Sequence, residues 1–296
     1  MQGLLLINKS ENKTSYGAVG CVKRITGERR VGHTGTLDPM ATGVLPVFLG
    51  RATALSSYLL EANKEYTAKI RLGTVTDTCD ITGKILQNNT VSLTNEDVIN
   101  VLKKFVGKQK QIPPMYSAVK KDGIRMYTLA REGKTVDLPP RDIEIFSITQ
   151  TSPLDGNNEF VIKTNVSKGT YIRSLCRDIG NMLGCGATLT ALCRTYASGF
   201  GIENCIDLEK LNSENVKEYI ISEEKAVEYL PEIFVTEKQA VRFCNGGQLA
   251  FDRLKNRDFK DGELYRIKFE DTFVGLGIAD VKNNQMAIKC IINDVR

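Results

Sequence analysis

The pattern of apolar and polar positions in the N-terminal part of the chain predicts both strands and helices. Residues 3–9 begin with a continuous apolar run and residues 64–72 alternate between apolar and polar, so both are expected to be strands. Residues 16–25 carry apolar side chains at helical spacing, and Gly27 provides a helix end. The chain is therefore expected to combine helices with a sheet.

The C-terminal part shows a different pattern. An acidic stretch, residues 203–232, is expected to be helical and includes Leu230-Pro231, where we place a domain boundary. Beyond it, short strand-like runs alternate with glycine-containing turns, which is typical of a small β-rich module. The sequence therefore predicts two domains, residues 1–231 and residues 232–296.

Composition fits a globular protein and narrows its chemistry. The 296 residues are 42% hydrophobic and 25% charged, and no apolar run approaches the about 18 residues needed to cross a membrane. Eight cysteines without a CxxC pair, and no export signal at the start, predict reduced thiols in a cytoplasmic protein. His33 is the single histidine, so no metal site is expected, and a histidine-activated nucleophile would have to use this residue.

Charge is unevenly distributed along the chain. Residues 103–141 contain ten lysines and arginines against three acidic residues, whereas residues 203–232 contain nine acidic residues against three lysines. The net charge of the whole chain is only +5. A local basic excess of this size predicts contact with a polyanion such as nucleic acid, although a solvated lysine-rich face has the same composition.

A glycine-rich loop at residues 32–43 is the strongest candidate for a functional site. Three glycines and Pro39 disfavour a regular helix or strand, and one carboxylate, Asp38, lies near the middle. On these residues alone, Asp38 has two interpretations. It caps a helix that begins at Pro39, or it is a catalytic carboxylate in a rigid loop.

Five ordered motifs, the first of them this loop, resemble the TruB family of tRNA pseudouridine-55 synthases. The resemblance implies an α+β pseudouridine synthase fold, with a mixed and largely antiparallel sheet flanked by helices. It also implies a thumb insertion at about residues 107–141 and a small C-terminal β-rich pseudobarrel that resembles a PUA module. The matching segments are residues 32–43, 65–73, 77–83, 112–120 and 169–175.

The family resemblance gives roles to five residues of the site. Asp38 is implied to be the nucleophile, Arg173 to pair with its carboxylate, and Tyr66 to stack on the target base. His33 is implied to enter the space that the flipped-out bases leave, and Tyr171 to pack beneath the site and position the arginine.

The remaining expected RNA contacts are basic side chains spread over three motifs. They are Lys9 in the N-terminal motif, Lys120, Arg125 and Arg131 in the thumb, and Arg194 near the end of the catalytic part. Two positions depart from the family pattern. Ser10 follows Lys9 where the family usually has proline, and Cys193 precedes Arg194 where paired arginines are common.

The implied reaction is an isomerisation. Pseudouridine formation breaks the N1–C1′ bond of a uridine, turns the base and rejoins it through C5. It imports no group and oxidises nothing, so no metal, nucleotide or redox cofactor is expected. A carboxylate nucleophile can attack C6 of the base or C1′ of the sugar, or assist a glycal route, and the sequence does not choose among these.

The implied substrate is uridine 55 in the T-loop of tRNA. The basic thumb would bind the T-arm stem-loop, and the C-terminal module would bind the acceptor end. No guide RNA or membrane is expected, and the protein is expected to be a monomer. The nearest alternative is a guide-RNA-dependent synthase, against which the long thumb at residues 111–133 argues. The alternative from another class is an RNA-binding folding chaperone with incidental catalysis.

Overall fold

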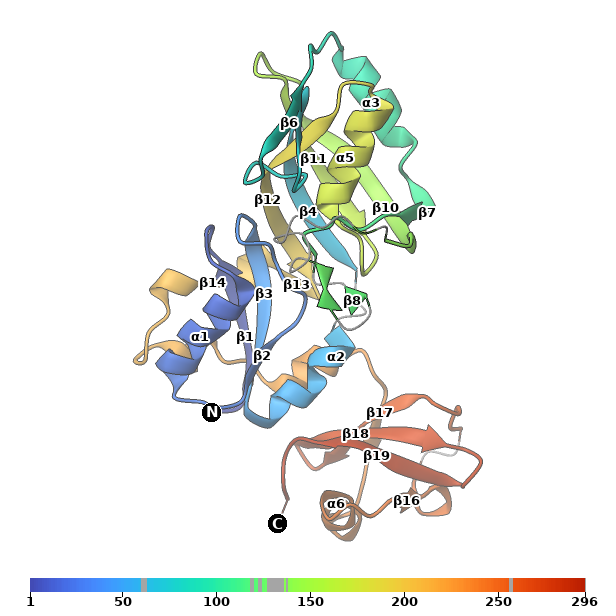
Figure 1. Cartoon of the computed structure of the whole chain (residues 1–296). Coiled ribbons are helices and arrows are strands. Elements are labelled where there is room, and N and C mark those ends of the chain that lie inside the picture. Colours follow the sequence, from blue (N-terminus) through green and yellow to red (C-terminus); the bar gives the residue numbers. More distant parts are fainter. Residues whose placement is uncertain are drawn as a thin grey trace.

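The chain folds around one large sheet and a second, smaller sheet (Figure 1). The computed structural model describes residues 1–59, 63–117, 120–121, 124–126, 136, 138–255 and 258–295. The large sheet is built only from strands before residue 202, apart from one short strand at residues 206–207. The smaller sheet begins at residue 232.

The large sheet has ten strands and is mixed. In order across it, the main strands are β14 (Ile206–Asp207), β1 (Gly3–Lys9), β3 (Thr42–Leu49), β12 (Ala187–Ala197), β4 (Lys64–Leu72), β11 (Glu159–Val166), β10 (Arg141–Ser152) and β7 (Gly107–Gln111). Two short strands pair outside this order: β2 (Val31–His33) with β3, and β13 (Phe200–Gly201) with β12. Among the described strands of this sheet, only β14–β1 and β3–β12 are parallel pairs. The largely antiparallel sheet expected from the sequence motifs is confirmed.

Three helices pack on this sheet. They are α1 (Ser15–Thr26), beside β2; α3 (Asn95–Lys103), against β10; and α5 (Ile172–Met182), against β12 and β4. Their ends follow local rules: the Thr14 side chain accepts the Gly17 N–H at the start of α1, and Gly27 ends that helix in the left-handed conformation. Apolar side chains from the three helices and the sheet form one continuous core.

The acidic stretch at residues 203–232 is not the predicted helix. It forms short 3-10 turns joined by extended residues, because side chains divert the backbone into local turns. Asn212 Oδ1, for example, accepts the N–H groups of Glu214 and Asn215. The 3-10 turns of the chain are η1 (Gly50–Leu55), η2 (Ile202–Asn204), η3 (Leu208–Lys210), η4 (Val216–Tyr219), η5 (Glu223–Val227) and η6 (Phe251–Arg253).

The C-terminal module is a curled five-stranded sheet with one helix. Its strands, in order, are β15 (Glu232–Phe234), β17 (Leu264–Phe269), β18 (Thr272–Asp280), β19 (Gln285–Ile291) and β16 (Leu249–Ala250), and its helix is α6 (Glu237–Cys244). The module has its own apolar core. A separate cluster joins it to the first domain, with Leu4, Phe48 and Leu55 packed in the same group as Phe273 and Ile292.

Smaller elements complete the described chain. They are helix α2 (Ser56–Leu59), the hairpin of β5 (Thr74–Thr76) and β6 (Ile85–Asn88), and the hairpin of β8 (Lys120–Lys121) and β9 (Ile124–Arg125). Among the residues that the structure describes, no helix is long and apolar enough to cross a membrane.

Candidate active site

The glycine-rich loop connects β2 to β3 and is held by the start of α1. Ser15 Oγ accepts the Leu37 N–H at 2.8 Å and donates to the carbonyl oxygen of the same residue at 3.2 Å. The Asp38 carbonyl oxygen accepts the Ala41 N–H at 3.0 Å, which closes a turn. This described stretch contains no helix after Pro39, so the helix-cap interpretation of Asp38 is wrong.

The last glycine of the loop permits close strand packing. Gly43 has a φ of +103°, and a Cβ atom there would lie 2.2 Å from the Arg194 carbonyl oxygen. The register pairs these two residues across β3 and β12. A side chain at this position would push the loop away from β12.

Two buried cationic side chains, Lys9 and Arg194, hold the loop by hydrogen bonds to backbone carbonyl oxygens. Lys9 Nζ donates to the carbonyl oxygens of Ser10, Lys13 and Pro39 at 2.7, 2.6 and 3.2 Å, and Lys9 is 0% exposed. The predicted contact of Lys9 with RNA is therefore corrected, because its ammonium group is enclosed by protein carbonyl oxygens.

Arg194 has the same kind of position at the other end of the loop. Its Nε donates to the Val44 carbonyl oxygen and its Nη2 to that of Gly35, both at 2.8 Å. The residue is 1% exposed. The predicted RNA contact of Arg194 is corrected for the same reason, since its guanidinium holds the two ends of the loop instead.

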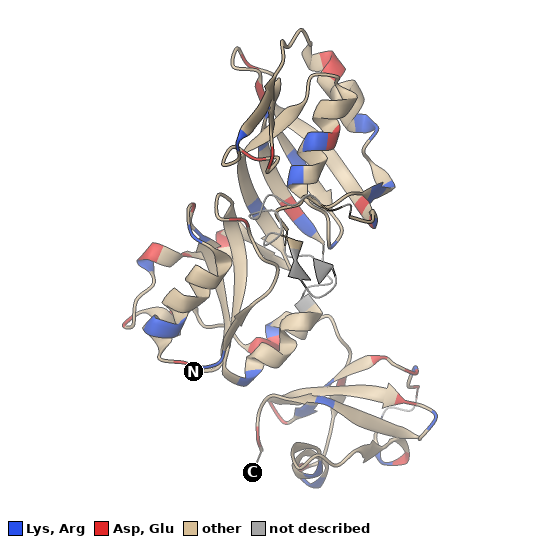
Figure 2. Ribbon diagram, in the orientation of Figure 1, with Lys and Arg blue, Asp and Glu red and all other residues tan. Residues whose placement is uncertain are grey.

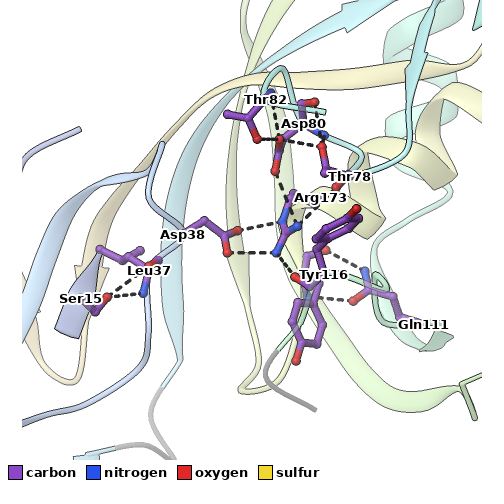
Figure 3. Close-up of polar contacts among 10 residues, drawn as sticks. Ser15, Leu37, Asp38, Thr78, Asp80, Thr82, Gln111, Tyr116 and Arg173 are labelled. Atoms are coloured by element: carbon purple, nitrogen blue, oxygen red, sulfur yellow. Dashed lines mark hydrogen bonds and ion pairs between the residues drawn. The ribbon is translucent and has the colours of Figure 1, made fainter. Parts of the chain in front are cut away.

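Asp38 and Arg173 form a two-pronged ion pair (Figure 3). Arg173 Nη2 donates to Asp38 Oδ1 at 2.9 Å, and Arg173 Nε lies 2.8 Å from Asp38 Oδ2. The arginine side chain is 5% exposed, whereas that of the aspartate is 34% exposed. The first turn of α5 thus fixes a buried guanidinium, and the carboxylate that it orients keeps an open side.

The Arg173 guanidinium has three further partners (Figure 3). Nη1 donates to the Thr78 carbonyl oxygen at 3.3 Å and lies 3.6 Å from Asp80 Oδ2. Nη2 also donates to the Tyr116 carbonyl oxygen at 2.8 Å. Segments far apart in the sequence therefore meet on one side chain.

Asp80 is a component of the site to which sequence reasoning assigned no role. Its Oδ1 accepts hydrogen bonds from Thr78 Oγ1 at 2.8 Å and from the N–H and Oγ1 of Thr82 at 3.0 and 2.6 Å. The residue is 4% exposed. The threonines two positions before and after it were the available signal, because such side chains fix a carboxylate in a turn.

Opposing influences act on the Asp38 carboxyl group. Burial raises its pKa above the ordinary value of 3.8, and the Arg173 guanidinium opposes that rise. The Asp80 carboxylate raises the pKa further, while Lys9 lowers it. The net direction is upward.

Tyr66 and His33 lie on strands beside the loop. Tyr66 is 7% exposed on β4, opposite Arg194 of β12. His33 ends β2, its Nε2 lies 3.4 Å from Thr36 Oγ1, and burial together with Arg194 lowers its pKa, which favours the neutral ring. Among the described residues, no hydrogen bond or ion pair joins Asp38 to Tyr66 or to His33.

The predicted thumb contacts fall where the structure describes little. Lys120 and Arg125 belong to the β8–β9 hairpin, of which only the backbone is described, and Arg131 lies outside the described residues. The described lysines of the basic segment lie on exposed positions at the end of α3 and along β7 (Figure 2). They are Lys103, Lys104, Lys108 and Lys110.

Within the described ranges, no group of three or more histidine, cysteine, aspartate or glutamate side chains is placed to hold a metal ion.

Comparison with protein families matches most of the chain. Residues 23–172 match the family described as TruB family pseudouridylate synthase (N terminal domain), and residues 173–235 match the tRNA pseudouridylate synthase B C-terminal domain. The first match contains Asp38, Tyr66 and Asp80, and the second begins at Arg173.

Curated relatives and solved structures agree with this match. The chain is 45% identical to "tRNA pseudouridine synthase B" of Clostridium tetani over 94% of this chain and 95% of the relative. A protein of the same name from Geotalea uraniireducens is 39% identical over 98% of this chain and 95% of the relative. Among solved structures, a Cbf5-Nop10-Gar1 complex matches with a TM-score of 0.75 and 28% identity over 99% of this chain and 85% of that chain.

A second solved structure, an H/ACA RNP bound to a substrate RNA containing 2′-deoxyuridine, matches with a TM-score of 0.73 and 26% identity over 98% of this chain and 85% of that chain. These TM-scores hold over nearly the whole of this chain, which has a large mixed sheet and a curled C-terminal sheet, so the predicted fold class is confirmed. The family predicted from the sequence motifs is confirmed as well. This chain belongs to the TruB family of pseudouridylate synthases, which are isomerases.

Proposed function

We propose that this protein converts uridine 55 in the T-loop of tRNA to pseudouridine, with Asp38 as the nucleophile. The observation that carries the proposal is the two-pronged ion pair between a buried Arg173 and a partly open Asp38. The names of the relatives that match over nearly their full length support tRNA as the substrate. Uridine 55 is the position implied by the sequence motifs.

The ion pair fits the chemical task. A carboxylate attacks only when ionised, and Arg173 opposes the effect of burial on the Asp38 pKa. Attack at C6 of the base or at C1′ of the sugar lets the N1–C1′ bond break. The base then turns, C5 bonds to C1′, the bond between Asp38 and the substrate breaks to restore the carboxylate, the proton on C5 is lost and N1 gains one. The balance is an isomerisation without any added group.

Tyr66 and His33 are proposed to handle the base. Tyr66 would stack on the target uracil from the edge of the apolar core, since every base offers a flat face to an aromatic ring. The uridine must leave the folded T-loop to reach Asp38, and a neutral His33 ring would fill the space it leaves.

RNA binding is proposed to use the basic segment. The exposed lysines at the end of α3 and on β7 would neutralise phosphates without reading sequence. We propose that the protein acts as a monomer and without a guide RNA. The 45% identity to the Clostridium tetani relative over 94% of the chain, against 28% identity to the matching chain of the Cbf5-Nop10-Gar1 complex, supports an enzyme that works alone.

The test is to incubate unmodified tRNA with the purified protein alone and map pseudouridine at single-nucleotide resolution. Pseudouridine at position 55 without added RNA or cofactor is the expected result. A product at another uridine would refute the position. Activity that appears only when a guide RNA is added would place the chain among the guide-RNA-dependent synthases.

A further inference from the structure

Residues 111–116, at the end of β7 and just after it, are joined to helix α5, which carries Arg173. The side chain of Gln111 makes the first of these contacts. Gln111 Oε1 accepts the Tyr171 N–H at 2.8 Å, and Gln111 Nε2 donates to the Tyr171 carbonyl oxygen at 3.1 Å (Figure 3). The side-chain amide of Gln111 thus donates one hydrogen bond to and accepts one from the backbone of a residue 60 positions away, as the backbone of a neighbouring strand would. Gln111 is 3% exposed, so water does not readily replace these bonds.

Tyr171 is the residue from which α5 starts. It has no side-chain hydrogen bond that caps the helix, and its carbonyl oxygen accepts the Leu175 N–H at 3.0 Å in the first turn. The same carbonyl oxygen accepts from Gln111. Gln111, at the end of β7, therefore holds the backbone from which α5 starts, and Arg173 is two residues further on.

Other contacts join the same two segments. Ser174 Oγ and Arg177 Nη2 both donate to the Ile112 carbonyl oxygen, at 2.8 and 3.1 Å. Arg173 itself donates to the Tyr116 carbonyl oxygen at 2.8 Å. Residues 111–116 thus contact Arg173 and its neighbours Ser174 and Arg177 on α5.

We propose that Gln111 is a positioning residue, which aligns Arg173 with Asp38 by pairing with the backbone of Tyr171. The rate measurements that test this inference rest on the proposed function, because they use T-arm RNA as substrate. The titration of Asp38 needs no substrate and rests on the structure alone. Because Gln111 lies within the predicted thumb insertion, at the end of β7, RNA bound by the thumb would bear on the ion pair through the same contact.

The test compares Gln111→Leu with Gln109→Leu. Gln109 is on the same face of β7, but its Nε2 donates to the Phe105 carbonyl oxygen at 2.6 Å and makes no bond to α5. Gln111→Leu is expected to lower the single-turnover rate on T-arm RNA by about 10–100-fold with less than about threefold change in affinity. Gln109→Leu is expected to stay within about twofold of the parent.

A double-mutant cycle separates positioning from general support. If Gln111 acts through the arginine, Gln111→Leu costs little further rate in an Arg173→Lys background. The same fold-loss in both backgrounds would overturn the proposal. So would equal effects of the two glutamine variants.

A substrate-free measurement gives a second readout. Burial raises the pKa of Asp38 and Arg173 lowers it, so displacement of Arg173 is expected to raise that pKa. The titration of the Asp38 carboxyl group, followed by carbon-13 NMR, should therefore move to higher pH in Gln111→Leu and stay in place in Gln109→Leu. If the titration of Asp38 in Gln111→Leu does not move, the positioning role is refuted. If the parent protein does not modify T-arm RNA, only the proposed function is refuted.

If Gln111→Leu does not fold, Gln111→Glu serves in its place. It keeps an acceptor for the Tyr171 N–H, and its protonated form regains a donor for the Tyr171 carbonyl oxygen. Its deficit in rate is therefore expected to shrink as pH falls. A deficit that is independent of pH would contradict the proposal.

Discussion

Arg173 lies between two carboxylates that differ in their surroundings. The Asp38 side chain is 34% exposed and has an open side, whereas Asp80 is enclosed and bound by its neighbouring threonines. The first can meet a substrate and the second cannot. Asp80 acts instead on the arginine and on the pKa of Asp38.

The Asp80 charge is open to a direct test at this scale. Asp80→Asn removes a carboxylate that raises the pKa of Asp38, and the amide oxygen can still accept from Thr82. Activity requires ionised Asp38 and is lost as pH falls through its pKa. The acidic limb of the pH–rate profile is therefore expected to move to lower pH.

The matched control is Asp77→Asn in the same turn, because Asp77 Oδ1 accepts the Lys84 N–H and is not a partner of Arg173. An acidic limb that stays in place or moves to higher pH in Asp80→Asn would contradict the account.

Some single residues of the site could be predicted from the sequence and others could not. The pairing of Asp38 with Arg173 was predicted from motifs, and the two side chains do meet. Lys9 and Arg194 were expected at the RNA surface and are buried. Their burial depends on carbonyl oxygens of Pro39 and Gly35, which the loop supplies only once the fold exists.

At the scale of elements, apolar periodicity predicted the N-terminal strands and the first helix but not the form of the acidic stretch. The first strand, α1 and β4 follow their apolar patterns closely. The acidic stretch has the composition of a helix but few apolar positions at helical spacing, and polar side chains turn it into 3-10 segments.

The loop and its strand give a prediction about glycine. Gly43→Ala is expected to destabilise the protein by more than about 2 kcal/mol, because it combines a positive φ with a Cβ at 2.2 Å from the Arg194 carbonyl oxygen. Gly20→Ala, inside α1 with nothing within 4 Å, is expected to stabilise it by about 0.5–1 kcal/mol.

Denaturant unfolding measures both glycine variants. Equal effects of the two substitutions would show that close packing of β3 on β12 does not depend on Gly43.

At the scale of the whole molecule, the C-terminal module is joined to the first domain by an apolar cluster. Phe273 is 4% exposed and packs in one group with Leu4, Phe48 and Ile292. The motif Leu230-Pro231 predicted a domain boundary, but no sequence pattern indicated this shared cluster. Contacts between distant apolar residues are set by the tertiary fold and leave no periodic pattern.

This cluster predicts that the two parts unfold together. Phe273→Ala is expected to cost about 3–5 kcal/mol and to lower the midpoint of a single cooperative transition. Phe234→Ala is the control, because Phe234 lies in the same module but is 52% exposed. Two separate transitions in the parent protein, seen by different probes, would contradict the shared cluster.

The most direct test of the central claim is the conversion of unmodified tRNA by Asp38→Asn, measured at position 55 beside the affinity for T-arm RNA. Asn keeps the size of the side chain and removes its nucleophilic charge. We expect no detectable pseudouridine with affinity within about threefold of the parent, and full activity in Asp142→Asn, an 88% exposed carboxylate paired with Lys110. Normal turnover in Asp38→Asn would show that Asp38 is not the nucleophile.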